Sequence, residues 1–258
     1  MIKELSELGK IRRGQKNENK WAHDAFKEEI ISMVLTIKND GSFVSLHSVE
    51  KIPTITEAIQ RTSGKDARLL IDNCGYVLKI YDPESNAFKK KIKEKGEKGA
   101  HEYFKNEVNE KFNLVVARLI EVQDIDELQP VLDFYDKNKE KGIYQITQEV
   151  FLKNIDKKDR AGNIAFLIMG KDEYAHKYDS VRKIITNNYD KKQEQRLKKG
   201  NRKCAVCGKN KFPVGDFTHF PIKRVPGDKE PAGGRKLISY NGDNNPFESM
   251  KWLVMKIV

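Results

Sequence analysis

The sequence predicts an α+β fold: an N-terminal β-hairpin or small sheet with packed helices, followed by a loop-rich basic module with a Cys-x-x-Cys pair. Residues 30–37 form an apolar, β-branched run, IISMVLTI, before an Asn-Asp-Gly turn signal. Residues 100–122 carry apolar side chains at helical spacing. Between residues 215 and 234 lie four glycines and three prolines, a density typical of loops.

The first predicted element is a β-hairpin. After the turn at residues 39–41, the segment SFVSLH alternates apolar and polar side chains with the period of a strand. Two such runs around an Asn-Asp-Gly turn predict an antiparallel pair over residues 30–47. Residues 69–78, LLIDNCGYVL, predict a further strand or the start of a helix.

The helical part begins after a lysine-rich stretch at residues 84–99, which we expect to be an exposed loop or the end of a helix. Solvation alone can account for a run of charge like this one. The apolar face of the following helix is formed by Tyr103, Phe104, Val108, Phe112, Val115, Val116 and Leu119.

A second helix bears Leu128, Val131, Leu132 and Tyr135. Asp124 can cap it, and Pro130 either perturbs it or marks its first turn.

Later elements suggest where the domains divide. Residues 163–170, NIAFLIMG, predict a buried strand, and residues 180–189 predict an amphipathic helix. Residues 190–203 are almost entirely polar and read as an exposed basic helix or linker. We therefore expect an α+β domain over residues 1–189, a basic linker or helix over 190–203, and an incomplete Cys-x-x-Cys module over 204–258.

The charge balance points to a polyanionic partner. The 258 residues include 49 Lys and Arg against 38 Asp and Glu, a formal net charge of +11. Nucleic acid is the usual partner for this sign, although a lysine-rich soluble protein could have the same excess. No apolar run is long enough to span a bilayer, and three cysteines do not make a disulfide framework. We expect a cytoplasmic protein.

Basic and small polar residues are the candidate DNA contacts. Lys and Arg neutralise phosphates with little regard to sequence, whereas Asn and Ser in turns can approach base edges. The candidates are Arg61, Ser63, Lys65, Arg68, Asn73, Lys223, Arg224, Arg235 and Lys236. For the segment around residues 61–73 the alternative is an ordinary turn, in which Asp72 or Asn73 caps a helix.

Cys204 and Cys207 have the spacing of a zinc knuckle, which places two thiolates on one ion. A tetrahedral site needs four ligands, and only His219 lies at a plausible distance downstream. The pair is therefore a half-site for zinc at most, or a metal-free turn with reduced thiols.

Catalytic motifs are missing from the sequence. It contains no phosphate-binding loop, no nucleophile elbow and no His-Glu-x-x-His motif. The carboxylate pairs Asp133/Asp136 and Asp156/Asp159 stand at helical spacing, but no metal-binding pattern accompanies them, so the sequence does not indicate a nuclease site. We expect a protein that is not an enzyme and that needs no cofactor, apart from the zinc alternative.

Two groups of motifs carry a resemblance to a known family. The C-terminal group is PIKRVPG, a Gly-Gly step, LISYN and FES; the N-terminal group is RTSG followed by DNCGYVL. In this order and spacing they resemble the large subunit of the type I CRISPR Cascade surveillance complex, subtype I-C most, with subtype I-B second. The resemblance covers roughly residues 1–249.

The resemblance implies a non-catalytic, DNA-binding subunit in antiviral defence. Such a subunit reads the protospacer-adjacent motif in the target duplex and helps to open the R-loop, while the guide RNA reads the sequence by base pairing. Its implied partners are the other Cascade subunits, the guide RNA and double-stranded target DNA.

The tail from residue 250, MKWLVMKIV, departs from the family pattern. We expect a copy that is truncated or frameshifted before the family's C-terminal helical domain. Two alternatives remain: a truncated homologue, for example phage-encoded, that inhibits Cascade assembly, and an unrelated zinc-ribbon protein that binds nucleic acid.

Overall fold

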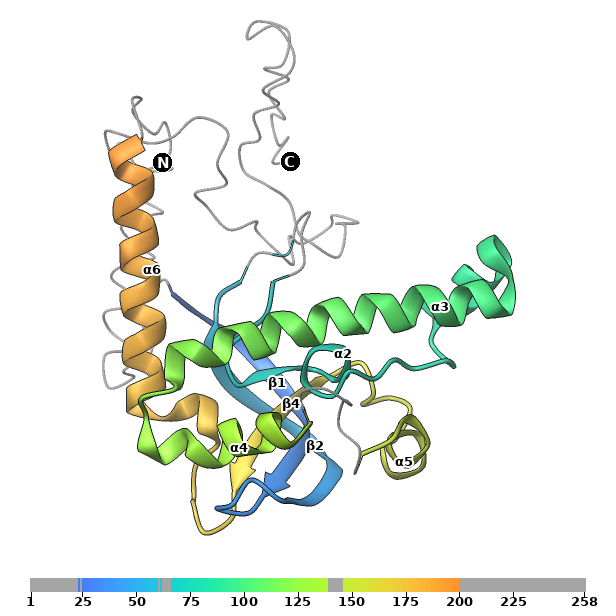
Figure 1. Cartoon of the computed structure of the whole chain (residues 1–258), viewed down its shortest axis with the longest axis horizontal. Helices are drawn as coiled ribbons and strands as arrows, with labels where there is room; N and C mark the ends of the chain where they lie inside the picture. The colour runs from blue at the N-terminus through green and yellow to red at the C-terminus, as the bar shows by residue number, and fades with distance from the viewer. Residues whose placement is uncertain (1–22, 24, 60, 62–65, 139–145, 200–258) are drawn as a thin grey trace, which may run out of the picture. The chain divides into compact units, whose positions relative to one another are not determined.

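The computed structural model describes residues 23, 25–59, 61, 66–138 and 146–199 (Figure 1). The chain divides into two units, Lys16–Tyr189 and a second that combines Met1–Gln15 with Asp190–Val258. Of the second unit, the described part is residues 190–199, the end of helix α6 (Asp179–Lys199). The predicted Cys-x-x-Cys module lies outside the described residues.

The first unit is built on a four-stranded mixed sheet with strand order β2-β1-β4-β3. Strand β1 (Phe26–Ile37) pairs antiparallel with β2 (Phe43–Glu57) and parallel with β4 (Asn163–Ile168). The short strand β3 (Ile71–Asn73) pairs antiparallel with β4. Sheet and helices are both present, so the predicted α+β class is confirmed.

The predicted hairpin is confirmed as β1 and β2. Its turn depends on Gly41, which has a positive φ of 75°. A Cβ atom at this position would lie 2.5 Å from the backbone nitrogen of Phe134. Glycine therefore allows the turn to pack directly on helix α4 (Gln129–Asn138).

The main core lies between one face of the sheet and the helices. On β1, Met33, Leu35 and Ile37 point to this face and are fully buried. Phe134 of α4 packs edge-on against Phe166 of β4, with ring centroids 5.7 Å apart. Figure 1 shows α3 (Asn86–Arg118) and α4 lying across the sheet. The other face of β1 is buried as well, since Val34 packs with Ile71 and Ala165 in a second apolar cluster.

Helix α3 decides between the two alternatives for residues 84–99, an exposed loop or the end of a helix, in favour of the helix. The lysine-rich stretch is helical from Asn86, because the Ser85 hydroxyl accepts a hydrogen bond from the Phe88 backbone and caps the helix. The helix bends sharply at Gly96, where φ is 71°. The predicted apolar face then continues to Arg118, and residues Leu119–Val122 form the 3-10 helix η1.

The remaining elements follow the predicted order. Residues 69–78 supply both predicted alternatives, strand β3 and then helix α2 (Cys74–Val77). The 3-10 helix η2 (Asp126–Leu128) leads into α4, with Pro130 in its first turn and without a cap from Asp124. Helix α5 (Gln148–Asn154) and the 3-10 helix η3 (Ala175–Lys177) flank the confirmed strand β4.

Within the described part of the chain, none of the helices has the length and apolar character that a membrane span requires.

Candidate nucleic-acid interface

Three of the predicted DNA contacts are described by the structure, and all three surround one carboxylate. Asp72 lies in β3 and is only 1% exposed. Arg61 binds it through the side chain, while Arg68 and Asn73 donate their backbone N–H groups to it. The structure therefore brings Arg61, Arg68 and Asn73 together around a residue that sequence reasoning assigned only to a helix cap.

Arg61 is held by three separate contacts. Its guanidinium donates to both carboxylate oxygens of Asp72, which makes a bidentate ion pair. Its Nε donates to the backbone oxygen of Asp66 at 2.7 Å. Its carbon Cζ lies 4.3 Å from the centre of the Tyr76 ring. These contacts fix Arg61 against β3 and α2 rather than leaving it extended into solvent.

Arg68 is buried, with 8% of its surface exposed. Its Nη2 donates to Glu29 of β1 at 2.7 Å, and its Nη1 donates to Asn163 of β4 at 3.2 Å. The backbone next to it turns through Leu70 with a positive φ of 62°. Such a conformation is costly for leucine, so the surrounding hydrogen bonds must hold the turn in place.

Asn73 ends strand β3 and begins helix α2. Its side-chain oxygen accepts a hydrogen bond from the backbone of Gly75 at 3.1 Å, the standard contact of an N-cap. The capping role that the sequence offered as an alternative is therefore present.

A second ionic cluster supports the same segment from the other side. Arg118, near the end of α3, donates to Glu57 of β2 at 2.5 Å and to the backbone oxygen of Ala67 at 2.5 Å. It also binds Glu121 at 2.8 Å. Burial lowers the pKa of Arg118, but the hydrogen bonds to Glu121 and the charge of Glu57 outweigh burial and raise it.

Sequence reasoning missed this second cluster. The spacing of Arg118 and Glu121 is that of a helical ion pair and could have indicated one contact. Glu57 is 61 residues from Arg118, so nothing local connects them. Glu57 also accepts from the Leu69 backbone at 3.2 Å, and the two clusters together fix residues 66–73 on the sheet.

The chemistry of this region is suited to holding a backbone segment. Burial raises the pKa of the Cys74 thiol to about 12, which keeps it protonated and unreactive near neutral pH. Among the described residues, no group of three or more His, Cys, Asp or Glu side chains could hold a metal ion. The carboxylates here bind arginines and backbone N–H groups.

The other predicted site residues lie outside the described residues. They are the DNA contacts Ser63, Lys65, Lys223, Arg224, Arg235 and Lys236, and the zinc half-site Cys204 and Cys207.

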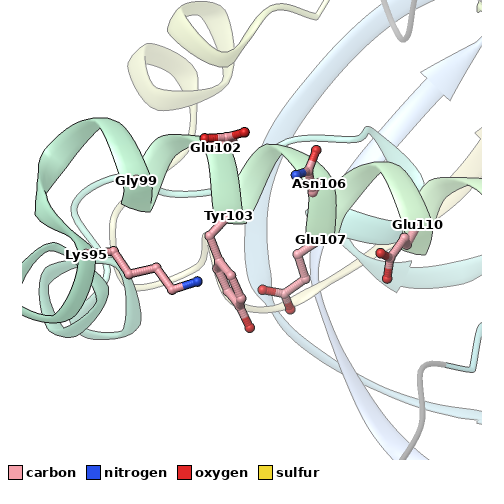
Figure 2. Close-up of a pocket in the computed structure, with 7 residues that line it drawn as sticks. All are labelled: Lys95, Gly99, Glu102, Tyr103, Asn106, Glu107 and Glu110. Carbon is pink, nitrogen blue, oxygen red and sulfur yellow. The ribbon is translucent and has the colours of Figure 1, made fainter.

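A second basic region occupies the beginning of α3. Residues 86–99 contain six lysines and two glutamates. Beyond the bend at Gly96 the helix is balanced in charge, with four glutamates against four Lys and Arg in residues 97–118. A hollow on α3 is lined by Lys95, Gly99, Glu102, Tyr103, Asn106, Glu107 and Glu110. In Figure 2 the ammonium group of Lys95 points toward the Tyr103 ring. Its nitrogen lies 5.2 Å from the ring centre.

Fold and composition together describe a basic α+β protein with an ion-paired sheet edge. A sequence model of the family described as CRISPR-associated protein (Cas_Csd1) matches residues 9–253, which is nearly the whole chain. The chain belongs to this CRISPR-associated family. Among curated proteins, the comparison finds no match.

Proposed function

We propose that the chain is the DNA-binding large subunit of a Cascade surveillance complex of subtype I-C, acting in antiviral defence without catalysis of its own. The observation that carries this proposal is the family match over residues 9–253. The formal charge of +11 and the motifs RTSG, PIKRVPG and LISYN support it. In this role it reads the protospacer-adjacent motif and promotes R-loop formation, together with guide RNA and the other subunits.

The contacts around Asp72 divide the predicted DNA-binding residues into two groups. Arg61 and Arg68 are engaged with Asp72, Glu29 and Asn163, so we assign them to positioning the segment. The phosphate and base contacts then fall to Ser63 and Lys65, to Asn73, and to the C-terminal basic residues Lys223, Arg224, Arg235 and Lys236. Cys204 and Cys207 stay a hypothesis for a zinc half-site.

The test is co-expression of the chain with the other Cascade subunits and a guide RNA. We expect the proteins and the RNA to purify together, and the complex to retain duplexes from a randomised library according to the motif beside the target. Lys65→Ala should weaken binding on all sequences and lower the salt slope by about one. The matched control is Lys51→Ala, an exposed lysine on β2.

Two results would overturn the proposal. One is a chain that does not join the complex. The other is a complex whose motif preference is the same with and without the chain. If the chain instead joins and abolishes motif binding, it acts as the inhibitor considered above. The family match covers Cys204 and Cys207, so an unrelated zinc ribbon no longer describes the chain.

A further inference from the structure

The beginning of α3 forms a folded-back basic tip. The helix starts at Asn86, runs for about ten residues, and reverses at Gly96 before continuing toward the sheet. A Cβ atom at Gly96 would meet no other atom within 4 Å, so the bend is open to solvent. In Figure 1 this part of α3 projects beyond the strands of the sheet.

An aromatic cluster holds the tip in place. Phe88 stacks on Tyr81 with ring centroids 5.7 Å apart, and Phe104 lies 5.4 Å from Phe88. The Tyr81 hydroxyl is hydrogen-bonded to Nδ1 of His101 at 2.8 Å. These contacts join the two arms of α3 and the preceding chain, so the tip presents its side chains from a rigid base.

The lysines of the tip fall into two sets. Lys91 pairs with Glu94 at 2.6 Å, and Lys91 and Lys95 lie 4.5 and 5.2 Å from the Tyr103 ring centre. Lys89, Lys90 and Lys93, which we call the tip lysines, are exposed. None of these three has an ion-pair partner within 4 Å among the residues that the structure describes.

The clustering of the tip lysines lowers the stability of the folded chain. Lys89 and Lys93 are one turn apart, so their like charges repel. Positive charge near the start of a helix also opposes the helix dipole. Acidic residues, which would relieve both effects, are missing from the first turn. The cost of gathering the charge here would be offset by an anionic partner.

We propose that the tip lysines bind the phosphate backbone of duplex DNA. This inference rests on the proposed function and adds to it a contact surface separate from residues 61–73. Ammonium groups act as compact point charges, which suits phosphates, whereas planar guanidinium or amide groups are the usual readers of base edges. Duplex DNA is the occupant to which we commit, since its charge density of one phosphate per about 1.7 Å best complements three clustered lysines.

The experiment compares triple variants of the full chain, alone and assembled with the other Cascade subunits and guide RNA, for binding to duplex DNA over a range of salt concentrations. In the first, Lys89, Lys90 and Lys93 are all changed to Gln. The control carries Lys51→Gln, Lys171→Gln and Lys183→Gln, which remove the same charge from exposed and scattered positions. A third variant replaces the tip lysines with Arg and keeps the charge.

We expect the tip variant to lose roughly tenfold or more in affinity at low salt, and its salt slope to fall by up to about three. The control should lose much less, and the Arg variant should bind as the wild type does. All variants should melt at the wild-type temperature or slightly above it, because the substituted side chains are exposed.

Other outcomes would overturn the inference. Equal losses in the tip variant and the control would mean that net charge alone matters. Loss of single-stranded RNA binding with unchanged duplex binding would assign the tip to RNA. If the wild-type chain joins the complex and binds DNA while the tip variant is unaffected, this inference alone fails. If the wild-type complex binds no DNA, the proposed function fails with it.

Discussion

The two basic regions of this protein use their charge in opposite ways. Around Asp72 and Glu57, the guanidinium groups of Arg61, Arg68 and Arg118 are largely withdrawn from solvent and bound to carboxylates. At the beginning of α3, Lys89, Lys90 and Lys93 are exposed and crowd together. In the first region the positive charges are paired within the protein. In the second they are exposed to solvent, where an anion could bind them.

The difference shows that basic residues in the sequence do not by themselves locate a nucleic-acid interface. Arg61 and Arg68 are candidates by sequence because Lys and Arg neutralise phosphates. In the structure their guanidinium groups are already bound to acidic partners within the chain. By sequence, Lys89, Lys90 and Lys93 are ordinary solvated charges, yet among the described residues no acidic side chain lies within ion-pair distance of them.

The largest expected effect comes from removing the shared carboxylate. Asp72→Ala should lower the free energy of unfolding by about 3–5 kcal/mol, because it leaves the Arg61 ion pair broken and the Arg68 and Asn73 backbone N–H groups without their acceptor. Urea unfolding of the two proteins measures it. Asp72→Asn, which keeps the shape and one acceptor oxygen, should lose less. A loss below about 1 kcal/mol for Asp72→Ala would show that the cluster is solvent-screened, as the tip is.

His176 is largely withdrawn from solvent, like the arginines around Asp72, but burial keeps its side chain neutral. Burial lowers the pKa of His176 to about 3, and its Nε2 lies 2.8 Å from the Thr54 hydroxyl. The unfolded chain, with an ordinary histidine pKa near 6.5, binds more protons between these values. Stability from this group is therefore complete above about pH 6.5. It is lost as the pH falls toward 3, at up to about 1.4 kcal/mol per pH unit.

His176→Gln tests this expectation. The variant should show a shallower decline of unfolding free energy between pH 6.5 and pH 4 than the wild type. His47→Gln, at an exposed position on β2, is the matched control and should keep the wild-type slope. A His176→Gln curve that runs parallel to the wild type would mean that other groups dominate acid unfolding.

The smallest expected effect comes from Asn73, and it distinguishes a capping role from a DNA contact. Asn73→Ala removes the N-cap of α2 and should cost about 1 kcal/mol of stability, whereas Asn73→Ser should recover much of it. A thermal melt gives the stability, and the randomised motif library gives the binding preference of the same variants. Unchanged preference would confine Asn73 to capping. A relaxed preference, worth roughly 1–3 kcal/mol between motifs, would add a base contact.

Local sequence patterns predicted the helices and strands better than they predicted which side chains meet across the fold. The β-branched run at residues 30–37 with its glycine turn predicted the hairpin, and the apolar spacing from Tyr103 to Leu119 predicted the second arm of α3. Composition could not separate loop from helix at residues 84–99, where the Ser85 cap and the Phe88 contacts decide the outcome. The candidate site was harder still. The partners of Arg68 come from β1 and β4, and only the folded sheet brings Glu29 and Asn163 to it.

The position of β4 has a consequence for how the chain must be made. It lies between β1 and β3, although it follows both in the sequence. During synthesis, the edge of β1 that pairs with β4 therefore has no partner strand until residue 168 has left the ribosome. An open edge beside the apolar run at residues 31–37 can capture other strands. Long-range parallel pairing also slows folding. The yield of folded protein should therefore depend on whether the unpaired edge of β1 avoids other strands until β4 has been made.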